Sequence, residues 1–349
     1  MSNFILISSG FDCTIKFWSN FATGTKPQEI FYHKENAINA LEMPKDKDKV
    51  AFATGNTIKF VDLNSIKLFP VFLSDLHEGL ITNILFPKKL NNIVITGGED
   101  NSVRISDMRV GKVIKSFLHS HFVNSIVITN NNKDIIAADE NGTIKIWDTK
   151  KDEMRNEYNP NVEEKLPAFR SISLAKNDEF LVGGKSNGNI CIFDLKNNDN
   201  ESQNLSQPKI FKAHDRYITK CLLSPENNIL ATCSADKELK LWERKNLKND
   251  VDNIQNNSTK NLSFEFDLLK IFKKHTKWVW DCDFTVDSQY ILSCSSDRTI
   301  KLWEIKTGKM IANIEDEYFK NQLFTAKFTI KNISQITNPT IKTISKIFA

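Results

Sequence analysis

Short apolar runs alternate with tight polar turns along most of the chain. Seven segments share one pattern, in which a turn precedes alternating apolar and polar residues that end at an aromatic or small residue. The copies are FDCTIKFW (11–18), GNTIKFVD (55–62), EDNSVRISD (99–107), ENGTIKIWD (140–148), SNGNICIFD (186–194), ADKELKLWE (235–243) and SDRTIKLWE (296–304). Because side chains alternate between the two faces of a strand, each copy predicts a β-strand.

Two further strands are predicted before each of these segments. The nearer one is apolar and ends in small residues, as in VAFATG (50–55), so that strand, turn and strand read as a hairpin. The farther one is a short apolar run: INALEM (38–43), ITNILF (81–86), VNSIVI (123–128), FRSISLA (169–175), ITKCLLS (218–224) and VWDCDF (279–284). With an outer strand after each aromatic position, every repeat supplies four strands.

The repeat length indicates the architecture. The aromatic-equivalent positions are 18, 61, 106, 147, 193, 242 and 303, which fits WD40 repeats of roughly 40–45 residues with longer loops late in the chain. A four-stranded blade cannot bury both faces alone, so blades stack, and a ring leaves no free end. We therefore predict an all-β, seven-bladed WD40 β-propeller.

The two ends of the chain predict how the ring closes. The N-terminus begins inside a repeat, and a lone apolar run, LFTAKFTI (323–330), follows the last hairpin. We expect this C-terminal strand to complete the first blade. Residues 1–330 would then form a single propeller with an Asn-rich loop insertion at 246–261, followed by a C-terminal tail, 331–349, for which no structure is predicted.

Composition narrows the class of protein. The net charge of +4 is not concentrated in any basic block, which argues against a nucleic-acid partner. No run of eighteen apolar residues and no basic leader region occurs, so we expect no direct membrane insertion and no secretion. Six cysteines are scattered without a C-x-x-C pair, which indicates reduced core residues.

Two repeats carry residues that resemble a catalytic triad with a tryptophan added: His214, Ser234, Asp236 and Trp242, and His275, Ser295, Asp297 and Trp303. Since the set recurs by repeat, we interpret it as a structural network. Asp would accept from His, His would lie near the Ser hydroxyl, and the indole N–H would join the same buried network. We therefore predict that the protein is not an enzyme.

Metal and cofactor sites are not predicted. Histidines occur mostly once per repeat, and only His119 and His121 are near neighbours, without further ligands. The glycine pairs Gly97-Gly98 and Gly183-Gly184 end strands and lack any phosphate-binding context. We expect no catalytic residues, no cofactor and no metal.

Aromatic residues gather just before the inner strands, on the narrow face of the predicted ring. Tyr217, Trp278 and Trp280 stand there with Leu80 and Phe122, and aromatic types are enriched at interface hot spots. We expect Tyr217 and Trp278 to contact a partner. For Trp280, partner contact and packing between blades both remain open.

Several longer segments resemble one family, the small WD-repeat (G-protein-β-like) subunit of the TOR kinase complexes. They are ISSGFDCTIKFW (7–18), INALEM (38–43), IKFVDLNS (58–65), TGGEDNSVRISDMR (96–109), KAHDRY (212–217), SPENNILATCSADKELKLW (224–242) and WVWDCDFTVDSQYILSCSSD (278–297). The resemblance covers Phe4 to Phe328. The sequence departs from the usual pattern at Ser106, at the insertion and in the tail.

The resemblance implies a non-catalytic scaffold subunit that binds the catalytic lobe of a TOR-family protein kinase and supports its activity in growth and nutrient signalling. Other TOR complex subunits would be further partners. The matching docking positions are Asn39, Tyr217, Trp278 and Trp280. It also implies a cytoplasmic location, peripheral at endomembranes through the complex.

Two other classes of function remain open. The chain could be a WD40 adaptor of another assembly, such as a ubiquitin ligase, a G-protein β-like complex or an iron–sulfur targeting complex, although no F-box or N-terminal coiled coil is predicted. An enzyme or small-ligand propeller would use the central channel, but the sequence offers no convergent carboxylates or metal ligands for it.

Overall fold

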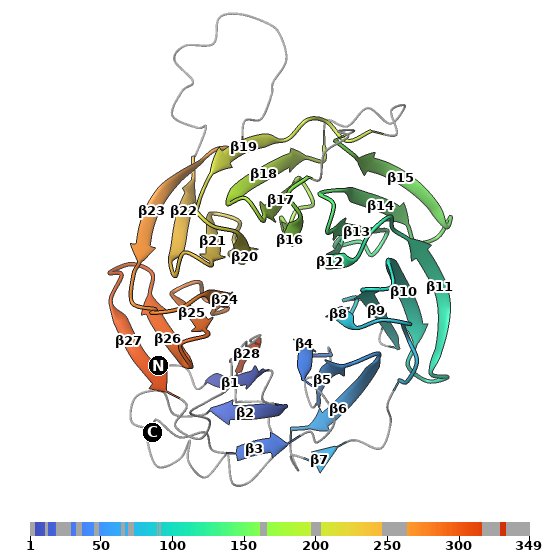
Figure 1. The fold of residues 1–349 in the computed structure, drawn as a ribbon, viewed down its shortest axis with the longest axis horizontal. Helices are drawn as coiled ribbons and strands as arrows, with labels where there is room; N and C mark the ends of the chain where they lie inside the picture. Colours follow the sequence, from blue (N-terminus) through green and yellow to red (C-terminus); the bar gives the residue numbers. More distant parts are fainter. Residues whose placement is uncertain are drawn as a thin grey trace, which may run out of the picture.

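The computed structural model describes residues 4–10, 13–18, 29–32, 37–44, 49–63, 67–68, 73–88, 90, 92–160, 166–196, 204–245, 264–315 and 329–332. Within these ranges the chain forms seven antiparallel four-stranded sheets and no helix. None of the described segments is therefore a helix that could cross a bilayer. Figure 1 shows the sheets standing around a central opening, and the predicted all-β propeller is confirmed.

The sheets are numbered in chain order. Sheet one has the order β28-β1-β2-β3, with β28 Thr329–Asn332, β1 Phe4–Ser9, β2 Thr14–Trp18 and β3 Glu29–Tyr32. Sheet two has β4 Ile38–Glu42, β5 Lys49–Thr54, β6 Thr57–Asp62 and β7 Lys67–Leu68. Sheet three has β8 Ile81–Leu85, β9 Ile93–Gly98, β10 Ser102–Asp107 and β11 Lys112–Leu118.

The remaining sheets follow the same inner-to-outer order. Sheet four has β12 Val123–Ile128, β13 Asp134–Asp139, β14 Ile144–Asp148 and β15 Glu153–Tyr158. Sheet five has β16 Phe169–Leu174, β17 Phe180–Lys185, β18 Asn189–Asp194 and β19 Lys209–Lys212. Sheet six has β20 Ile218–Leu223, β21 Ile229–Ser234, β22 Leu239–Arg244 and β23 Phe266–Phe272, and sheet seven has β24 Val279–Phe284, β25 Tyr290–Ser295, β26 Thr299–Glu304 and β27 Met310–Glu315.

Burial follows the predicted strand character. The second strand of a sheet is almost wholly buried, as in β13 and β17, because neighbouring sheets cover both of its faces. The outer strands β11 and β23 are mostly exposed. The core lies between the sheets: one cluster joins Phe180 and Val182 of sheet five to Cys221 and Leu230 of sheet six.

The cysteines belong to this core. Five of the six are buried. Burial raises the pKa of Cys191 to about 11 and that of Cys221 to about 12. At neutral pH these thiols are protonated and unreactive, which agrees with the core role predicted from their apolar neighbours.

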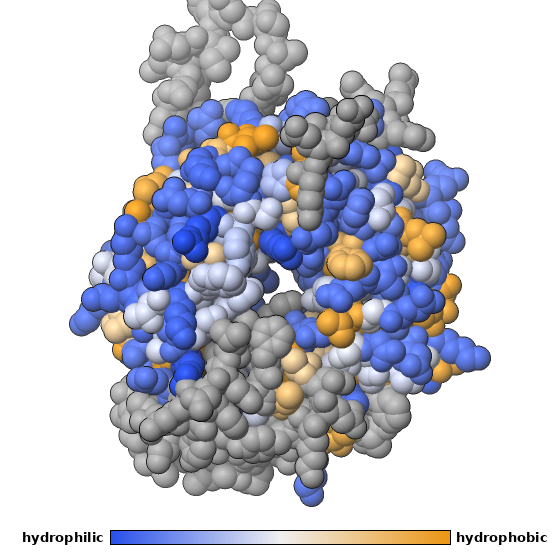
Figure 2. Space-filling model, viewed as in Figure 1, coloured by the Kyte–Doolittle hydropathy of each residue, from blue (hydrophilic) through white to orange (hydrophobic). Residues whose placement is uncertain are grey.

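The inner strands frame the opening. Contacts join β4 to β8, β8 to β12, β12 to β16, β16 to β20, β20 to β24 and β24 to β28. An opening remains visible at the centre of the space-filling view (Figure 2). The insertion 246–261 lies outside the described residues, as does the tail from 333 onward, whereas β28 includes Lys331 and Asn332, which the sequence analysis assigned to the tail.

Candidate partner-binding site

Six inner strands begin with the same local distortion. In each, a β-bulge leaves the second residue without a register partner on the neighbouring strand. The bulged residues are Asn39, Thr82, Asn124, Arg170, Thr219 and Trp280. Because they share one register position, they mark one end of the ring, which we call the loop face.

A four-member hydrogen-bond network supports the loop face in sheet six. His214 Nδ1 lies 2.7 Å from Asp236 Oδ2, and His214 Nε2 lies 2.8 Å from the Thr232 hydroxyl. The Trp242 indole N–H donates to the same hydroxyl over 2.9 Å. The hydroxyl therefore accepts from the indole and also bonds to the imidazole, so each buried polar group in the network has a partner.

Sheet seven repeats this arrangement. His275 lies 2.9 Å from Asp297 and 2.8 Å from the Ser293 hydroxyl, which accepts from Trp303 over 2.9 Å. Burial lowers the pKa of His275, although the hydrogen bond with Asp297 opposes this. Burial acts to raise the pKa of Asp297, but its hydrogen bonds with His275 and Thr299 outweigh burial and hold the pKa well below 3.8. The pair is thus a neutral imidazole and an ionised carboxylate.

The expected role of Ser234 and Ser295 in these networks is wrong. The hydroxyl beside each imidazole belongs to the residue two positions earlier, Thr232 or Ser293. The reason lies in the hairpin register. Trp242 pairs with Leu230, so the nearest hydroxyl on the same strand face is two residues beyond Leu230.

Ser234 and Ser295 instead tie the hairpin turn to the preceding loop. Ser234 Oγ donates to the Arg216 carbonyl over 3.4 Å, and Ser295 Oγ donates to the Lys277 carbonyl over 3.1 Å. Each hydroxyl also accepts the backbone N–H two residues later. These bonds fix the loops that carry Tyr217 and Trp278.

Sequence reasoning missed related networks in other sheets. In sheet three, His77 lies 2.8 Å from Asp100 and 2.7 Å from Thr96, although Ser106 replaces the tryptophan. In sheet four, the carboxylate beside His119 belongs to Asp139, at 3.1 Å.

The signal that finds them is a spacing. The aspartate follows the histidine by 20 to 23 positions in all four sheets. A hydroxyl precedes the tryptophan position by ten in sheets three, six and seven, whereas sheet four has Ala137 there. Trp18 and Ser8 share the second spacing and are joined by a 2.9 Å bond.

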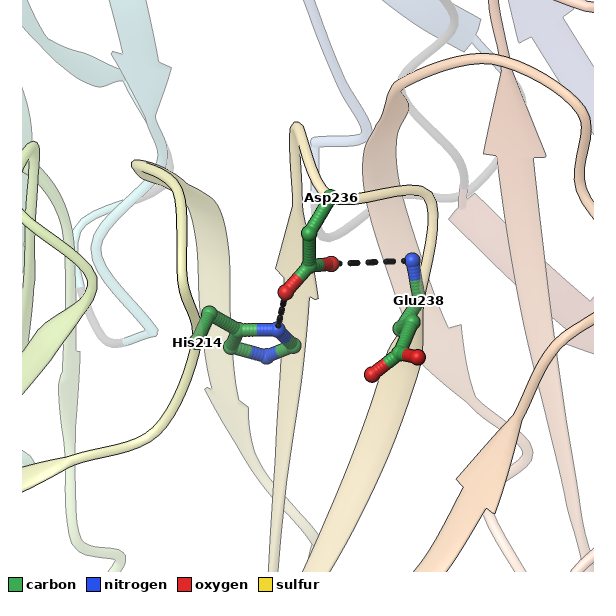
Figure 3. Close-up of side chains that lie close together, drawn as sticks. All are labelled: His214, Asp236 and Glu238. Carbon is green, nitrogen blue, oxygen red and sulfur yellow. Dashed lines mark hydrogen bonds and ion pairs between the residues drawn. The ribbon is translucent and has the colours of Figure 1, made fainter.

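One group of side chains in sheet six lies close enough to hold a cation: His214, Asp236 and Glu238. Figure 3 shows Asp236 between the other two, bonded to the imidazole of His214 and to the backbone N–H of Glu238. Both imidazole nitrogens are already bonded, and the Glu238 carboxylate pairs with Lys240 at 3.2 Å and Lys273 at 2.7 Å. The arrangement therefore fits a structural network better than a metal site.

Three predicted partner-binding residues form one aromatic cluster. The Tyr217 and Trp278 rings meet edge to face with centroids 5.2 Å apart, and the Trp278 and Trp280 centroids are 5.5 Å apart. All three side chains are half-buried. Trp280 also packs against the core and donates to Ser296 over 2.6 Å. The structure therefore assigns it a packing role, without excluding partner contact.

Asn39 stands apart from this cluster. It is the bulged residue of β4 in sheet two, whereas the aromatic cluster belongs to sheets six and seven. Thr82, Asn124 and Thr219, at the same register position, each donate to a carbonyl of the next sheet. The register thus suits Asn39 equally to bonding between sheets and to partner contact.

The opposite end of the channel holds a cavity of about 570 Å³. It is lined by the ends of the inner strands and includes Glu42, Lys88, Lys176 and Lys220. Lys88 bonds to Asn130, and Lys220 pairs with Asp281 at 3.4 Å. Two of the lining lysines are thus already bonded to neighbouring side chains.

Comparisons with known proteins agree with these features. The WD domain, G-beta repeat family matches residues 111–148, 205–243 and 266–304. The Target of rapamycin complex subunit wat1 of Schizosaccharomyces pombe is 32% identical, over 70% of this chain and 75% of its own length. The Target of rapamycin complex subunit LST8 is 30% identical in Saccharomyces cerevisiae, over 68% of this chain, and 31% identical in Mus musculus, over 69%; the matches span 76% and 73% of those proteins.

The four-stranded sheets and their recurring His, Asp, hydroxyl and Trp networks therefore belong to a WD40-repeat propeller, a class of binding proteins. Within that class the chain belongs to the family of Target of rapamycin (TOR) complex subunits LST8 and wat1. Fold and family together indicate a non-catalytic scaffold subunit.

Proposed function

We propose that this chain binds the catalytic lobe of a TOR-family protein kinase through the loop face and supports the activity of that kinase. The observation that carries the proposal is the aromatic cluster of Tyr217, Trp278 and Trp280 in a chain of this family. Half-buried aromatic rings on fixed loops provide contact area with little loss of conformational entropy on binding. Asn39 would also belong to this interface. Other TOR complex subunits would be further partners of the chain.

The test is co-purification of the kinase with Tyr217→Ala and Trp278→Ala variants. Ile210→Ala and Leu268→Ala are matched controls, since they remove exposed apolar side chains from the outer strands β19 and β23. We expect each loop-face variant to recover at least about tenfold less kinase, as for an interface hot spot, and kinase activity in the complex to fall in parallel. Undiminished recovery at unchanged melting temperature would overturn the assignment. Recovery of a different assembly by the wild type would favour the adaptor alternative.

The proposal includes the organisation of the chain. The seven sheets would be the blades of one closed propeller, with the C-terminal strand β28 completing the first blade, so that the propeller would extend to residue 332. The insertion 246–261 would be a loop outside that ring, and the tail would begin at residue 333. The protein would be cytoplasmic and peripheral at endomembranes through its complex, which imaging of a tagged chain with and without the kinase would test.

A further inference from the structure

Five basic residues belong to the loops that carry the aromatic cluster and to the hairpin turns bonded to those loops: Arg216, Lys237, Lys274, Lys277 and Arg298. Four are exposed and Arg298 is half-buried. In the described part of the chain, none of them has a carboxylate within ion-pair distance. Their charges are therefore available to a partner.

Backbone hydrogen bonds join the turns of Lys237 and Arg298 to the loops that carry the rings. The Tyr217 carbonyl accepts from Ala235 over 3.1 Å, which places the turn of Lys237 against that loop. The Trp278 carbonyl accepts from Ser296 over 3.0 Å, which does the same for the turn of Arg298. Two loops and two turns thus form one rigid patch.

The acidic groups of the same region are already engaged. Asp236 and Asp297 are bonded to histidines, and Glu238 pairs with two lysines. Asp215 is the exposed exception. On the opposite side of the channel, the exposed Leu80 lies next to Glu78 and Glu99 in sheet three, and its carbonyl accepts the backbone N–H of Glu99. Within the described residues, neither glutamate has an ion pair. Among the residues that the structure describes, the loop face is therefore basic and aromatic beside sheets six and seven and acidic beside sheet three.

We propose that this basic aromatic patch of sheets six and seven binds an acidic segment of the partner protein that also carries apolar anchor side chains. Carboxylates of the segment would pair with Arg216, Lys274 and Lys277, while its anchors would pack on Tyr217 and Trp278. Side chains beside the central opening next to β20 and β24 are of intermediate hydropathy, and hydrophilic ones lie around them (Figure 2). That the partner is a TOR-family kinase rests on the proposed function. The preference of the patch for a segment with acidic and apolar side chains does not depend on it.

A single-stranded nucleic acid is the other polymer that combines negative charge with stacking groups. It requires open ring faces on which bases can stack. Here the Trp278 ring is packed against its neighbours at interplanar angles of 80° and 59°. This packing favours an acidic peptide over a single-stranded nucleic acid.

The test uses the full chain and two synthetic peptides that share Leu and Phe anchors. One carries Asp and Glu between the anchors, and the other carries Lys at those positions. The variant Arg216→Gln/Lys274→Gln/Lys277→Gln is compared with Lys112→Gln/Lys150→Gln/Lys151→Gln, which removes three exposed lysines from sheets three and four. We expect the acidic peptide to bind more tightly than the basic one, with about tenfold weaker binding in the first variant only. Equal binding of the two peptides, equal loss in both variants, or preferential binding of oligouridylate would overturn the proposal.

A parallel measurement with the TOR-family kinase separates the two proposals. If the kinase binds wild type and the loop-face triple variant equally at low and at high salt, the acidic-segment proposal fails while the proposed function stands. If the acidic peptide binds but the kinase does not, the proposed function fails and the chemistry of the patch is supported.

Discussion

Thr232 and Ser293 each stand between a buried imidazole and a buried indole. Neither ring nitrogen can reach water from these positions, so the hydroxyl is the group that satisfies both. The serines of the Ser-x-Asp turns bond mainly to backbone groups of the turn and loop. Two kinds of hydroxyl, two residues apart, therefore contribute differently to stability.

Thr232→Val keeps the shape of the side chain but removes the shared hydroxyl. We expect the free energy of unfolding to fall by about 3 kcal/mol, because two buried nitrogens lose their partner. Ser234→Ala is the control and should cost about 1 kcal/mol, since it removes a long bond to a carbonyl and a turn contact. Urea denaturation of both variants provides the values. Equal losses would contradict the assigned roles.

The buried histidines predict how stability depends on pH. Burial lowers the pKa of His275 and His77 in the folded state below the ordinary 6.5, so the unfolded chain binds protons first as pH falls. Their contribution is complete above about pH 6.5 and declines below it. The lowered pKa of Asp297 adds a further decline below 3.8.

We therefore expect His77 and His275 to lower the melting temperature as pH falls from about 7.5 to 5.5, whereas Asp283, whose pKa burial raises to about 8, acts in the opposite direction. His275→Gln should be less stable at neutral pH but show a shallower fall over the same range. A melting series of both proteins checks this, and parallel slopes would exclude His275 as a source of the pH dependence.

At the scale of elements, the turn of one sheet supports the loop of the next. Gly188, between β17 and β18, has a φ of +83° and accepts the backbone N–H groups of Ala213 and His214. A Cβ placed there would lie 2.1 Å from the His214 carbonyl oxygen and 2.7 Å from that of Arg216. Any larger residue must displace the loop that carries Tyr217.

Gly188→Ala should therefore lower both stability and kinase recovery, the latter by about tenfold, as expected when a hot-spot residue is displaced. Gly111→Ala is a matched control because Gly111 also has a positive φ, +68°, but a Cβ there would approach only Leu73, at 3.8 Å. The control should cost about 1 kcal/mol of backbone strain and leave binding unchanged. Equal kinase recovery by the two variants would show that the loop tolerates the displacement.

At the scale of the whole molecule, the two ends of the described chain meet in one sheet. β28 pairs with β1 in an antiparallel ladder that runs from Phe4 opposite Asn332 to Ile7 opposite Thr329. Without β28, β1 would become a free inner edge facing the channel, and edge strands are prone to pairing with other chains. The proposed closure thus links folding of the first and last segments.

Deleting residues 321–349 removes β28, whereas deleting 333–349 retains it. The first deletion should lower the free energy of unfolding by about 3 kcal/mol, through several lost ladder bonds of about 1 kcal/mol each, and promote self-association. The second retains the ladder between β28 and β1 and should change the free energy of unfolding by less than about 0.5 kcal/mol. Melting and size-exclusion measurements compare them, and equal behaviour would refute the closing role of β28.

Much of the fold follows from local pattern. Alternation along TIKLWE or NICIFD specifies a strand, and the polar turns before them specify hairpins, because side-chain periodicity and turn conformation depend on neighbouring residues only. The His, Asp and Trp members of the networks, the buried cysteines and the aromatic loop positions were recognisable for the same reason.

Other features depend on contacts between elements. Hairpin register decides that Thr232, and not Ser234, meets His214; packing of sheet six against sheet seven brings Tyr217 to Trp278 and gives Trp280 a place in the core. Backbone hydrogen bonds hold the turns of Lys237 and Arg298 against the loops of Tyr217 and Trp278. By itself the sequence therefore determined the strands, the turns and the family of this protein. Only the tertiary structure decided which hydroxyls, rings and charges meet, because these contacts join residues far apart along the chain.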